Sequence, residues 1–241
     1  MIEIIHLSRE IEGQKILDDI TLQTDGGRLL AVLGPSGAGK TSLLRLIAGL
    51  DRPSRGEIKI SGRTVSSPVM MTPPALRRVS LIFQHLALWP HLTALGNIEF
   101  VIDRERYPTR AAVMEQIDHL LSMMHLKDHK NRYPGELSGG EKQRLAIARA
   151  LASDPEYLLM DEPFSNLDDL LKDELLGMTL SLKEKDRMTI IYVTHNIDEA
   201  LFLADKMVVL KAGRIVKTWV SEEIKNLSRE EVLQQAFRAE G

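Results

Sequence analysis

Residues 34–41 read Gly34-Pro35-Ser36-Gly37-Ala38-Gly39-Lys40-Thr41. An apolar run over residues 29–33, typical of a strand buried on both faces, precedes them, and a helical apolar pattern over residues 41–50 follows. The spacing fits G-x-x-x-x-G-K-[ST], and a strand before and a helix after are the context that this pattern requires. The sequence therefore predicts a phosphate-binding loop rather than a Gly-rich turn with a chance lysine.

The residue types in this loop suit a nucleoside triphosphate. Glycines let backbone N–H groups approach phosphate oxygens, and the N-terminus of the following helix adds a positive dipole end. Lys40 can reach the β- and γ-phosphates, and the Thr41 hydroxyl can ligate Mg²⁺. We therefore expect residues 34–41, together with Ser42, to bind ATP and Mg²⁺.

Outward from this loop, strands alternate with helices, which predicts a mostly parallel sheet covered on both faces. Between residues 85 and 154 the apolar spacing turns helical, which indicates a separate lobe, and the Pro-rich residues 66–75 are expected to form a loop. The expected strands cover residues 2–7, 16–22, 29–33, 57–60, 79–83, 157–160, 189–193 and 207–210. The expected helices cover residues 41–50, 94–101, 110–124, 139–152, 169–184 and 197–203, and a capping box of Ser228 and Glu231 opens a last one.

Composition excludes several classes of protein. The 241 residues are 44% apolar and 27% charged, as in a soluble globular domain, and the net charge of −3 argues against a nucleic-acid partner. The chain has no cysteine, which excludes disulfides and thiolate metal sites. Its apolar stretches are shorter than the roughly 18–20 residues that cross a bilayer, and the N-terminus has no signal pattern. We expect a cytoplasmic protein that reaches a membrane only through a partner.

Two adjacent carboxylates, Asp161 and Glu162, follow the expected strand at residues 157–160. The carboxyl ends of parallel strands meet at the sheet edge where ligands bind in such folds. Asp161 is suited to hold Mg²⁺, and Glu162 is then free to polarise the attacking water. An acidic pair at this place is more often a solvated strand end, but the Lys40–Thr41 motif favours the catalytic interpretation.

A second Gly-rich motif reads Leu137-Ser138-Gly139-Gly140-Glu141. Ser138 would cap a helix whose first N–H groups form an anion site, although a plain capped helix start explains the stretch equally well. The motif resembles the LSGGQ signature of ABC ATPases, with Glu141 where Gln is commonest.

Three further motifs match this family in order along the chain. Gln84 matches the Q-loop glutamine, Ser165-Asn166-Leu167-Asp168 matches the D-loop, and His195 matches the switch histidine. A lone Gln or His at a strand end is usually structural or solvated. Six motifs in the family's order, from residue 34 to residue 195, nevertheless make the chain resemble the ATP-binding subunit of an ABC transporter.

The resemblance implies an α/β fold: a P-loop NTPase (RecA-like) core with a mostly parallel sheet, N-terminal antiparallel strands and an inserted helical lobe. One ABC ATPase domain would span residues 1–241, with residues 1–84 and 155–241 as nucleotide-binding core and residues 85–154 as helical signature subdomain. The chain ends about 30 residues past its last expected strand. We therefore expect it to lack the C-terminal regulatory β-domain common in sugar and polyamine importer ATPases.

The resemblance also implies roles for the matched residues. Gln84 and His195 would join Glu162 as catalytic groups, with the imidazole of His195 at the γ-phosphate. Thr41, Gln84 and Asp161 would hold Mg²⁺.

The family implies a head-to-tail dimer, in which the signature of one subunit closes on the ATP bound by Lys40 of the other. The signature residues are Ser138, Gly139 and Gly140, and Asp168 of the D-loop would also contribute. Phosphoryl transfer needs added charge stabilisation, which closure can supply in trans. Because the chain has one copy of each motif, a homodimer would hold two composite sites, and a related subunit could replace the twin.

Residues 86–98 resemble the segment that importer ATPases present to their permease. Their Leu and Trp content suits a groove for an apolar partner helix, although the same residues could form the core of the helical lobe. We expect an importer ATPase peripheral to the cytoplasmic face of the membrane, with an exporter or mechanotransmission ATPase as the alternative. A soluble ABC ATPase is less favoured, because the chain has one cassette, no inserted coiled coil and a net negative charge.

The chain departs from the family at the adenine contact. ABC ATPases usually place an aromatic residue in the loop after the first strand, but residues 7–13 contain none, and Ile11 occupies that position. Base–aromatic stacking is worth roughly 1–3 kcal/mol per base in single-stranded nucleic-acid complexes, so Ile11 should hold adenine less firmly.

Overall fold

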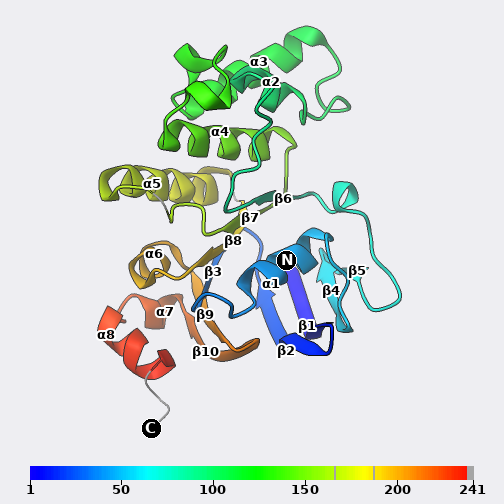
Figure 1. The fold of residues 1–241 in the computed structure, drawn as a ribbon, viewed down its shortest axis with the longest axis vertical. Coiled ribbons are helices and arrows are strands. Elements are labelled where there is room, and N and C mark those ends of the chain that lie inside the picture. The colour runs from blue at the N-terminus through cyan, green and yellow to red at the C-terminus, as the bar shows by residue number, and fades with distance from the viewer. Residues whose placement is uncertain (166, 187, 238–241) are drawn as a thin grey trace.

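The computed structural model describes residues 1–165, 167–186 and 188–237. Its centre is a six-stranded sheet in the order β10-β9-β3-β8-β7-β6 (Figure 1). Neighbouring strands are parallel except β10, which pairs antiparallel with β9, so the expected mostly parallel sheet is confirmed. The strands are β3 (Leu29–Leu33), β6 (Val79–Ile82), β7 (Tyr157–Asp161), β8 (Thr189–Thr194), β9 (Lys206–Lys211) and β10 (Arg214–Val220).

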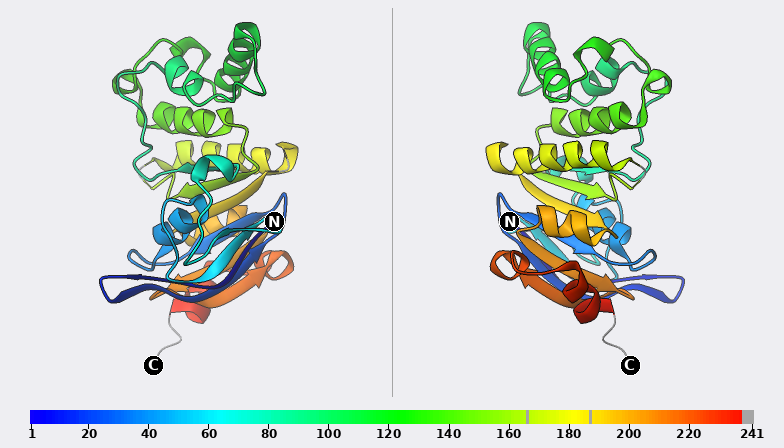
Figure 2. Two further views of the ribbon diagram at one scale, coloured as in Figure 1. Left: turned by 90° about the vertical axis from the view of Figure 1, so that its right-hand side faces the viewer. Right: turned by 90° about the vertical axis from the view of Figure 1, so that its left-hand side faces the viewer.

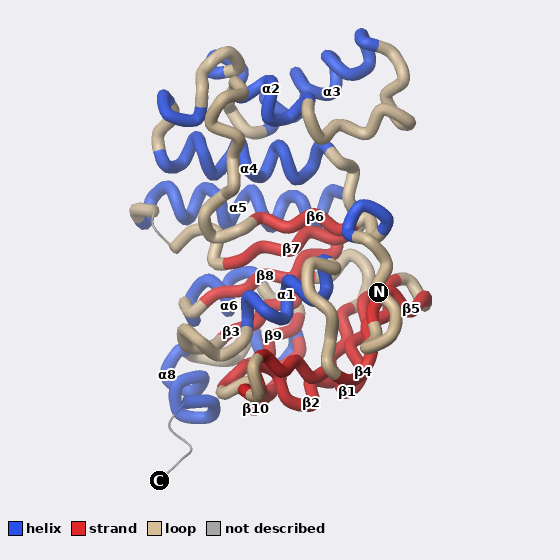
Figure 3. The backbone as a smooth tube through the Cα atoms, turned by 45° about the vertical axis from the view of Figure 1, so that its right-hand side comes forward, coloured by secondary structure: helices blue, strands red, loops and turns tan. Residues whose placement is uncertain are grey.

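The helices lie at both ends and on both faces of this sheet. Figures 1 and 3 show α2, α3 and α4 stacked at one end as a helical layer, with α5 between α4 and the strands. In Figure 2, α6 lies against the sheet and α8 lies near the C-terminus. None of the helices described is long and apolar enough to span a membrane. The helices are α1 (Lys40–Ala48), α2 (Ala94–Glu99), α3 (Arg110–Met123), α4 (Gly139–Ala152), α5 (Asp169–Asp186), α6 (Ile197–Leu203), α7 (Ser221–Ile224) and α8 (Arg229–Val232).

The strand that leads into residues 34–41 is buried on both faces, as its apolar run predicts. Leu30 and Val32 belong to a hydrophobic core shared with Leu43 of α1. Leu29 belongs to the second core, together with Ala200 of α6. These two cores hold the end of β3 in place, so the loop that follows starts from a rigid point.

A second sheet, in the order β2-β1-β4-β5, is antiparallel and contains the first strands of the chain, as expected. The expected loop at residues 7–13 is wrong, because β1 continues to Ile11 and only Glu12 and Gly13 form the turn. Both turn residues have positive φ, 51° and 79°, as a two-residue hairpin requires. The strands are β1 (Ile2–Ile11), β2 (Gln14–Thr24), β4 (Arg55–Ile60) and β5 (Arg63–Ser66).

The carboxyl end of α1 is anchored by Arg77, which is 3% exposed and follows a short 3₁₀ turn, Pro74–Leu76. Its guanidinium donates to the carbonyl oxygens of Leu46 and Ile47, and also to those of Val65 and Thr72. Burial lowers the pKa of Arg77 to about 10. Since these carbonyls include the unpaired ones that end a helix, Arg77 fixes α1 at the end opposite the Gly-rich loop.

Candidate functional site: a phosphate loop facing two carboxylates and a histidine

Residues 34–39 join β3 to α1, and Lys40 and Thr41 begin the helix, so the predicted order of strand, loop and helix is confirmed. Gly37 and Gly39 have φ of 78° and 102°, where a side chain would be strained. A Cβ on Gly34 would lie 2.2 Å from the carbonyl oxygen of Leu210 in β9, so the close approach of these two backbones needs glycine. The loop ends at the N-terminus of α1, where free N–H groups and the helix dipole favour an anion.

Lys40 connects the loop to the end of β7. Its side chain is buried, and Nζ donates to the carbonyl oxygens of Gly34, at 2.8 Å, and Pro35, at 3.0 Å. Nζ also lies 3.1 Å from Oε1 of Glu162. Burial raises the pKa of Glu162, but the hydrogen bond and charge of Lys40, together with His195, outweigh it and hold the pKa below its usual range. Glu162 is therefore an ionised carboxylate beside the phosphate loop.

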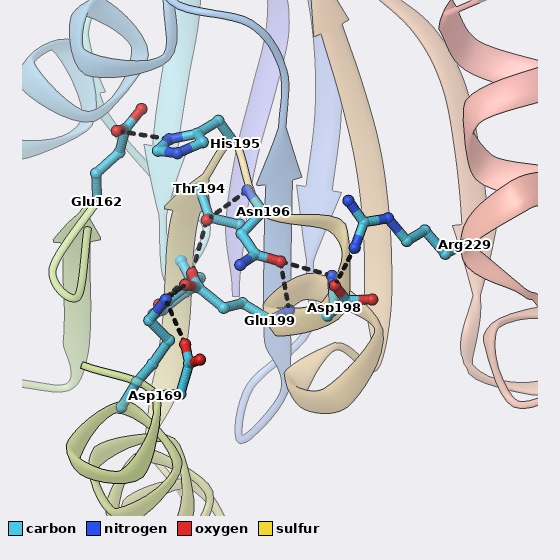
Figure 4. Close-up of polar contacts among 10 residues, drawn as sticks. Glu162, Asp169, Thr194, His195, Asn196, Asp198, Glu199 and Arg229 are labelled. Carbon is cyan, nitrogen blue, oxygen red and sulfur yellow. Dashed lines mark hydrogen bonds and ion pairs between the residues drawn. The ribbon is translucent and has the colours of Figure 1, made fainter. Parts of the chain in front are cut away.

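His195 reaches the same carboxylate from the end of β8. Its Nδ1 lies 2.9 Å from Oε2 of Glu162 (Figure 4). Glu162 has a φ of 44°, in the left-handed region that non-glycine residues rarely adopt, and its N–H donates to the carbonyl of Val193 in β8. Such strain persists only where the surroundings enforce it, and it concentrates at functional sites.

Asp161, Thr41 and Gln84 have the oxygen ligands that Mg²⁺ prefers. The Thr41 hydroxyl donates to Oδ1 of Asp161 at 3.2 Å, and Gln84 lies on the same cavity as Thr41. Burial raises the pKa of Asp161 above its usual range, and a bound cation would offset that cost. No cluster of three or more His, Asp or Glu side chains that could hold a metal occurs in the described part of the chain. The Thr41 hydroxyl, the Asp161 carboxylate and the Gln84 amide are a donor set that fits Mg²⁺, which keeps several waters.

Lys40, Thr41, Gln84 and Glu162 line a cavity of about 370 Å³, whereas Asp161 and His195 do not line it. Ile16 of β2, which belongs to no motif, also lines it, and the sequence indicates it only through its place in a predicted strand. Ile11 does not line the cavity and is 44% exposed at the end of β1, so the structure does not bring it to the phosphate loop. The lining residues are Ile16, Ser36, Gly37, Gly39, Lys40, Thr41, Ser42, Gln84 and Glu162.

A larger cavity, of about 830 Å³, opens around Arg28, Lys183 and Asp205. Arg28 and Lys183 both form ion pairs with Asp205, at 3.5 and 3.3 Å, so these charges already satisfy one another. Its two glycines, Gly26 and Gly27, lie in the turn before β3 and not at the N-terminus of a helix, so its volume does not make it the better phosphate site.

The signature motif forms the start of α4, and its residues do not line the cavity of about 370 Å³. The Ser138 hydroxyl accepts from the N–H of Glu141, whose carboxylate accepts the Ser138 N–H, so the capping box is complete. That hydrogen bond outweighs burial and lowers the pKa of Glu141. A Cβ on Gly140 would lie 2.3 Å from Leu171 of α5, so the two helices pack closely here.

The D-loop connects β7 to α5. Asp168 caps α5, because its Oδ1 accepts the N–H of Leu171 at 3.0 Å, and it does not line the cavity of its own chain. Ser165 and Leu167 are described, whereas Asn166 lies outside the described residues.

The segment of residues 86–98 is held in shape by two side chains. Asn97 is fully buried and bonds both the N–H and the carbonyl of Trp89. Arg149 of α4 donates to the carbonyls of Leu86 and Ala87, and its guanidinium carbon lies 4.9 Å from the Trp89 ring centroid. Burial lowers the pKa of Arg149.

Comparison with known proteins shows the family. Residues 17–165 match the family model described as ABC transporter. The chain belongs to the ABC transporter family. The match covers more than half of the chain, from β2 to the D-loop, and so includes the phosphate loop, the signature and both carboxylates.

Curated relatives in this family are longer than the chain. The sulfate/thiosulfate import ATP-binding protein CysA of Yersinia pestis is 42% identical over 226 residues, which cover 92% of this chain and 61% of the relative. Its counterpart in Escherichia coli strain K12 is 40% identical over 226 residues, which again cover 92% of this chain and 61% of the relative. The chain thus spans about three-fifths of the length of these relatives.

Solved structures of the ABC transporter family share the fold. The dimeric post-hydrolysis state of the ATP-binding cassette MJ0796, bound to ADP and Pi, is 29% identical with a TM-score of 0.80, covering 92% of this chain and 99% of that one. The ADP conformation of the cassette MJ1267 has a TM-score of 0.82 over 100% of this chain and 99% of its own, and at 23% identity it shows the fold alone.

The exposed Ile11 leads to a prediction about base selectivity. We expect GTP to compete almost as well as ATP, because the phosphate contacts of Lys40 and Thr41 do not depend on the base. Ile11→Tyr should tighten ATP binding, since aromatic stacking on a base is worth roughly 1–3 kcal/mol. Calorimetry measures both effects, with Val69→Tyr, at an 89% exposed loop position, as control. A strong ATP preference that Ile11→Tyr leaves unchanged would show that another group contacts adenine.

Proposed function

We propose that this chain is the ATP-binding subunit of an ABC importer and hydrolyses ATP to drive a partner permease. The observation that carries the proposal is the contact of Glu162 with both Lys40, at 3.1 Å, and His195, at 2.9 Å, beside the phosphate loop. This arrangement supports a reaction in which an ionised base, a phosphate-binding cation and an imidazole act on one γ-phosphate.

In the proposed reaction Glu162 accepts a proton from water as the water oxygen attacks the γ-phosphorus. The bond from that phosphorus to the β,γ-bridging oxygen breaks, which releases ADP and phosphate. Lys40 neutralises the β- and γ-phosphates, and His195 contacts the γ-phosphate from the side of β8. Thr41, Asp161 and Gln84 would hold Mg²⁺, which when bound supplies further charge neutralisation at the phosphate oxygens.

We infer further that two subunits are needed for a complete site. The signature residues lie outside the cavity around Lys40 of their own chain, so their helix N-terminus is available to the ATP of a partner. The solved relative MJ0796 is dimeric. In this proposal residues 85–154 act as a signature subdomain attached to a nucleotide-binding core of residues 1–84 and 155–241.

The proposed permease contact is made by the segment of residues 86–98 together with Phe100. Phe100 is 70% exposed and its ring centroid lies 4.7 Å from that of Trp89, which makes an apolar patch beside an ordered segment. Leu88, in contrast, packs against the core, so it supports the fold rather than the contact. Docking there would place the chain on the cytoplasmic face of a membrane. The relatives named for sulfate/thiosulfate import suit an importer, and in this proposal the permease selects the cargo.

ATP hydrolysis and the permease contact are tested by comparing the wild-type chain with Phe100→Asp. We expect the purified wild-type chain to hydrolyse ATP with Mg²⁺ and to retain a multi-span membrane protein from solubilised membranes of its source. Phe100→Asp should keep the hydrolysis rate within about twofold and lose the membrane protein, because an exposed charge blocks an apolar helix. Asp118→Asn, on α3, is the control. A wild-type chain without ATPase activity would overturn the enzymatic part, and retention by Phe100→Asp would overturn the docking surface.

A further inference from the structure

Glu199 is a buried carboxylate that the proposed reaction does not use. It lies in the first turn of α6, is 5% exposed, and does not line the nucleotide cavity. Its Oε2 accepts hydrogen bonds from the hydroxyls of Tyr192, at 2.9 Å, and Thr194, at 2.7 Å. Its Oε1 lies 3.7 Å from Nζ of Lys172 in α5. A carboxylate buried this deeply destabilises the fold unless it is paired. The two hydroxyls and the Lys172 ammonium group offset that cost for Glu199.

One of these contacts, that of Thr194, holds the backbone on either side of His195. The Thr194 hydroxyl donates to Glu199 and accepts the N–H of Asn196 at 3.0 Å (Figure 4). The Asn196 side chain in turn accepts the N–H groups of Asp198 and Glu199 and caps α6. His195 is 55% exposed in its side chain and is therefore not fixed by packing. Apart from its own contact with Glu162, its position depends on the hydrogen bonds of its two neighbours.

The third contact joins this turn to the start of α5. Lys172 lies one turn after Asp168, and its N–H donates to the Asp168 carbonyl at 3.0 Å. The neighbouring Leu171 packs against Gly140 of the signature helix. The first turn of α5 thus contacts the signature on one side and Glu199 on the other.

We propose that Glu199 is a positioning residue that orients His195 through the Thr194 hydroxyl and, through Lys172, couples His195 to the D-loop end of α5. The inference rests on the proposed function, because it assigns His195 a task in ATP hydrolysis. A shift of α5 relative to α6 moves Lys172, and with it the carboxylate that holds the turn of His195. The signature helix, packed on the same turn of α5, is then linked mechanically to the switch histidine.

A purely structural role for Glu199 predicts a different pattern of effects. Tyr192 and Thr194 each donate one hydrogen bond to the same oxygen, so loss of this donated bond should cost similar stability at either position. Only Thr194 also holds the backbone next to His195. Burial, followed by the charge of Glu199, raises the pKa of Tyr192 well above its usual value, so its phenol stays a donor. Tyr192→Phe is therefore a matched control for Thr194→Val.

The test compares kcat, the KM for ATP and the melting temperature of these variants with wild-type ATPase activity. We expect Thr194→Val to lower kcat at least about tenfold with the KM within about twofold, because the phosphate contacts remain while His195 is misplaced. Thr194→Ser, which keeps the hydroxyl, should retain the wild-type kcat, and Tyr192→Phe should stay within about twofold of it.

Lys172, whose side chain is less buried than Thr194, provides a second pair of variants. Lys172→Met should lower kcat with an unchanged KM, and Lys172→Arg should restore most of the rate, because a cation again faces Glu199. The proposal is overturned if Thr194→Val and Tyr192→Phe lower kcat equally, or if Lys172→Met leaves kcat unchanged in a folded protein. Absence of hydrolysis by the wild-type chain would instead contradict the proposed function, so the two failures are distinguishable.

Discussion

Glu162→Gln is expected to bind ATP and to hydrolyse it at least about 100-fold more slowly than the wild-type chain. The amide keeps the shape of the carboxylate but cannot accept a proton from the attacking water. It also removes the negative charge 3.1 Å from Nζ of Lys40, which frees the ammonium group for the phosphates. Binding should therefore survive or tighten while the chemical step nearly stops.

The variant should then accumulate as an ATP-bound dimer, which size-exclusion chromatography separates from the monomer. Phosphate release under single-turnover conditions measures the chemical step itself. Glu115→Gln, on the exposed face of α3, makes the same chemical change away from the cavity and should behave as wild type. Hydrolysis by Glu162→Gln at close to the normal rate would mean that another group activates the water.

The second large effect concerns the division of one site between two chains. Lys40→Ala removes the phosphate-binding cation, and Ser138→Asp places a carboxylate where the signature would meet the partner's γ-phosphate. Each variant alone should lose nearly all activity. Asp at position 138 retains an oxygen that can cap α4, so the helix should not be destabilised by loss of its cap, which costs about 1 kcal/mol.

Much of the fold could be predicted because its signals are local. The apolar run at residues 29–33 and the motif after it define a strand, a loop and a helix from adjacent residues. The strands β5 and β10 were missed, since they are short or largely solvent-facing and have no continuous apolar run. The boundary of β1 was also wrong: Arg9 and Glu10 look like loop residues, but pairing with β2 makes them strand.

Some residues of the candidate site could likewise be predicted from the sequence, and others could not. The contact of Thr41 with Asp161 was predictable, because Asp161 ends one strand of the parallel sheet, Thr41 follows another, and both lie at its carboxyl edge. Ile16, Arg149 and Glu199 belong to no motif. Ile16 and Arg149 contact parts of the chain that are distant in sequence, and Glu199 is distinguished by its buried hydrogen bonds. Such residues are recognisable only when burial and hydrogen bonds are known.

A mixture of the two inactive variants tests the shared site most directly. In a mixed dimer one site loses both Lys40 and the signature serine, and the other keeps both. Random pairing in a 1:1 mixture makes about half of the dimers mixed, so about a quarter of all sites, and of the wild-type phosphate-release rate, should return. Mixed dimers isolated with two different affinity tags should have about half of the wild-type rate per dimer. Tagged mixed dimers without ATPase activity would contradict a site built from both subunits.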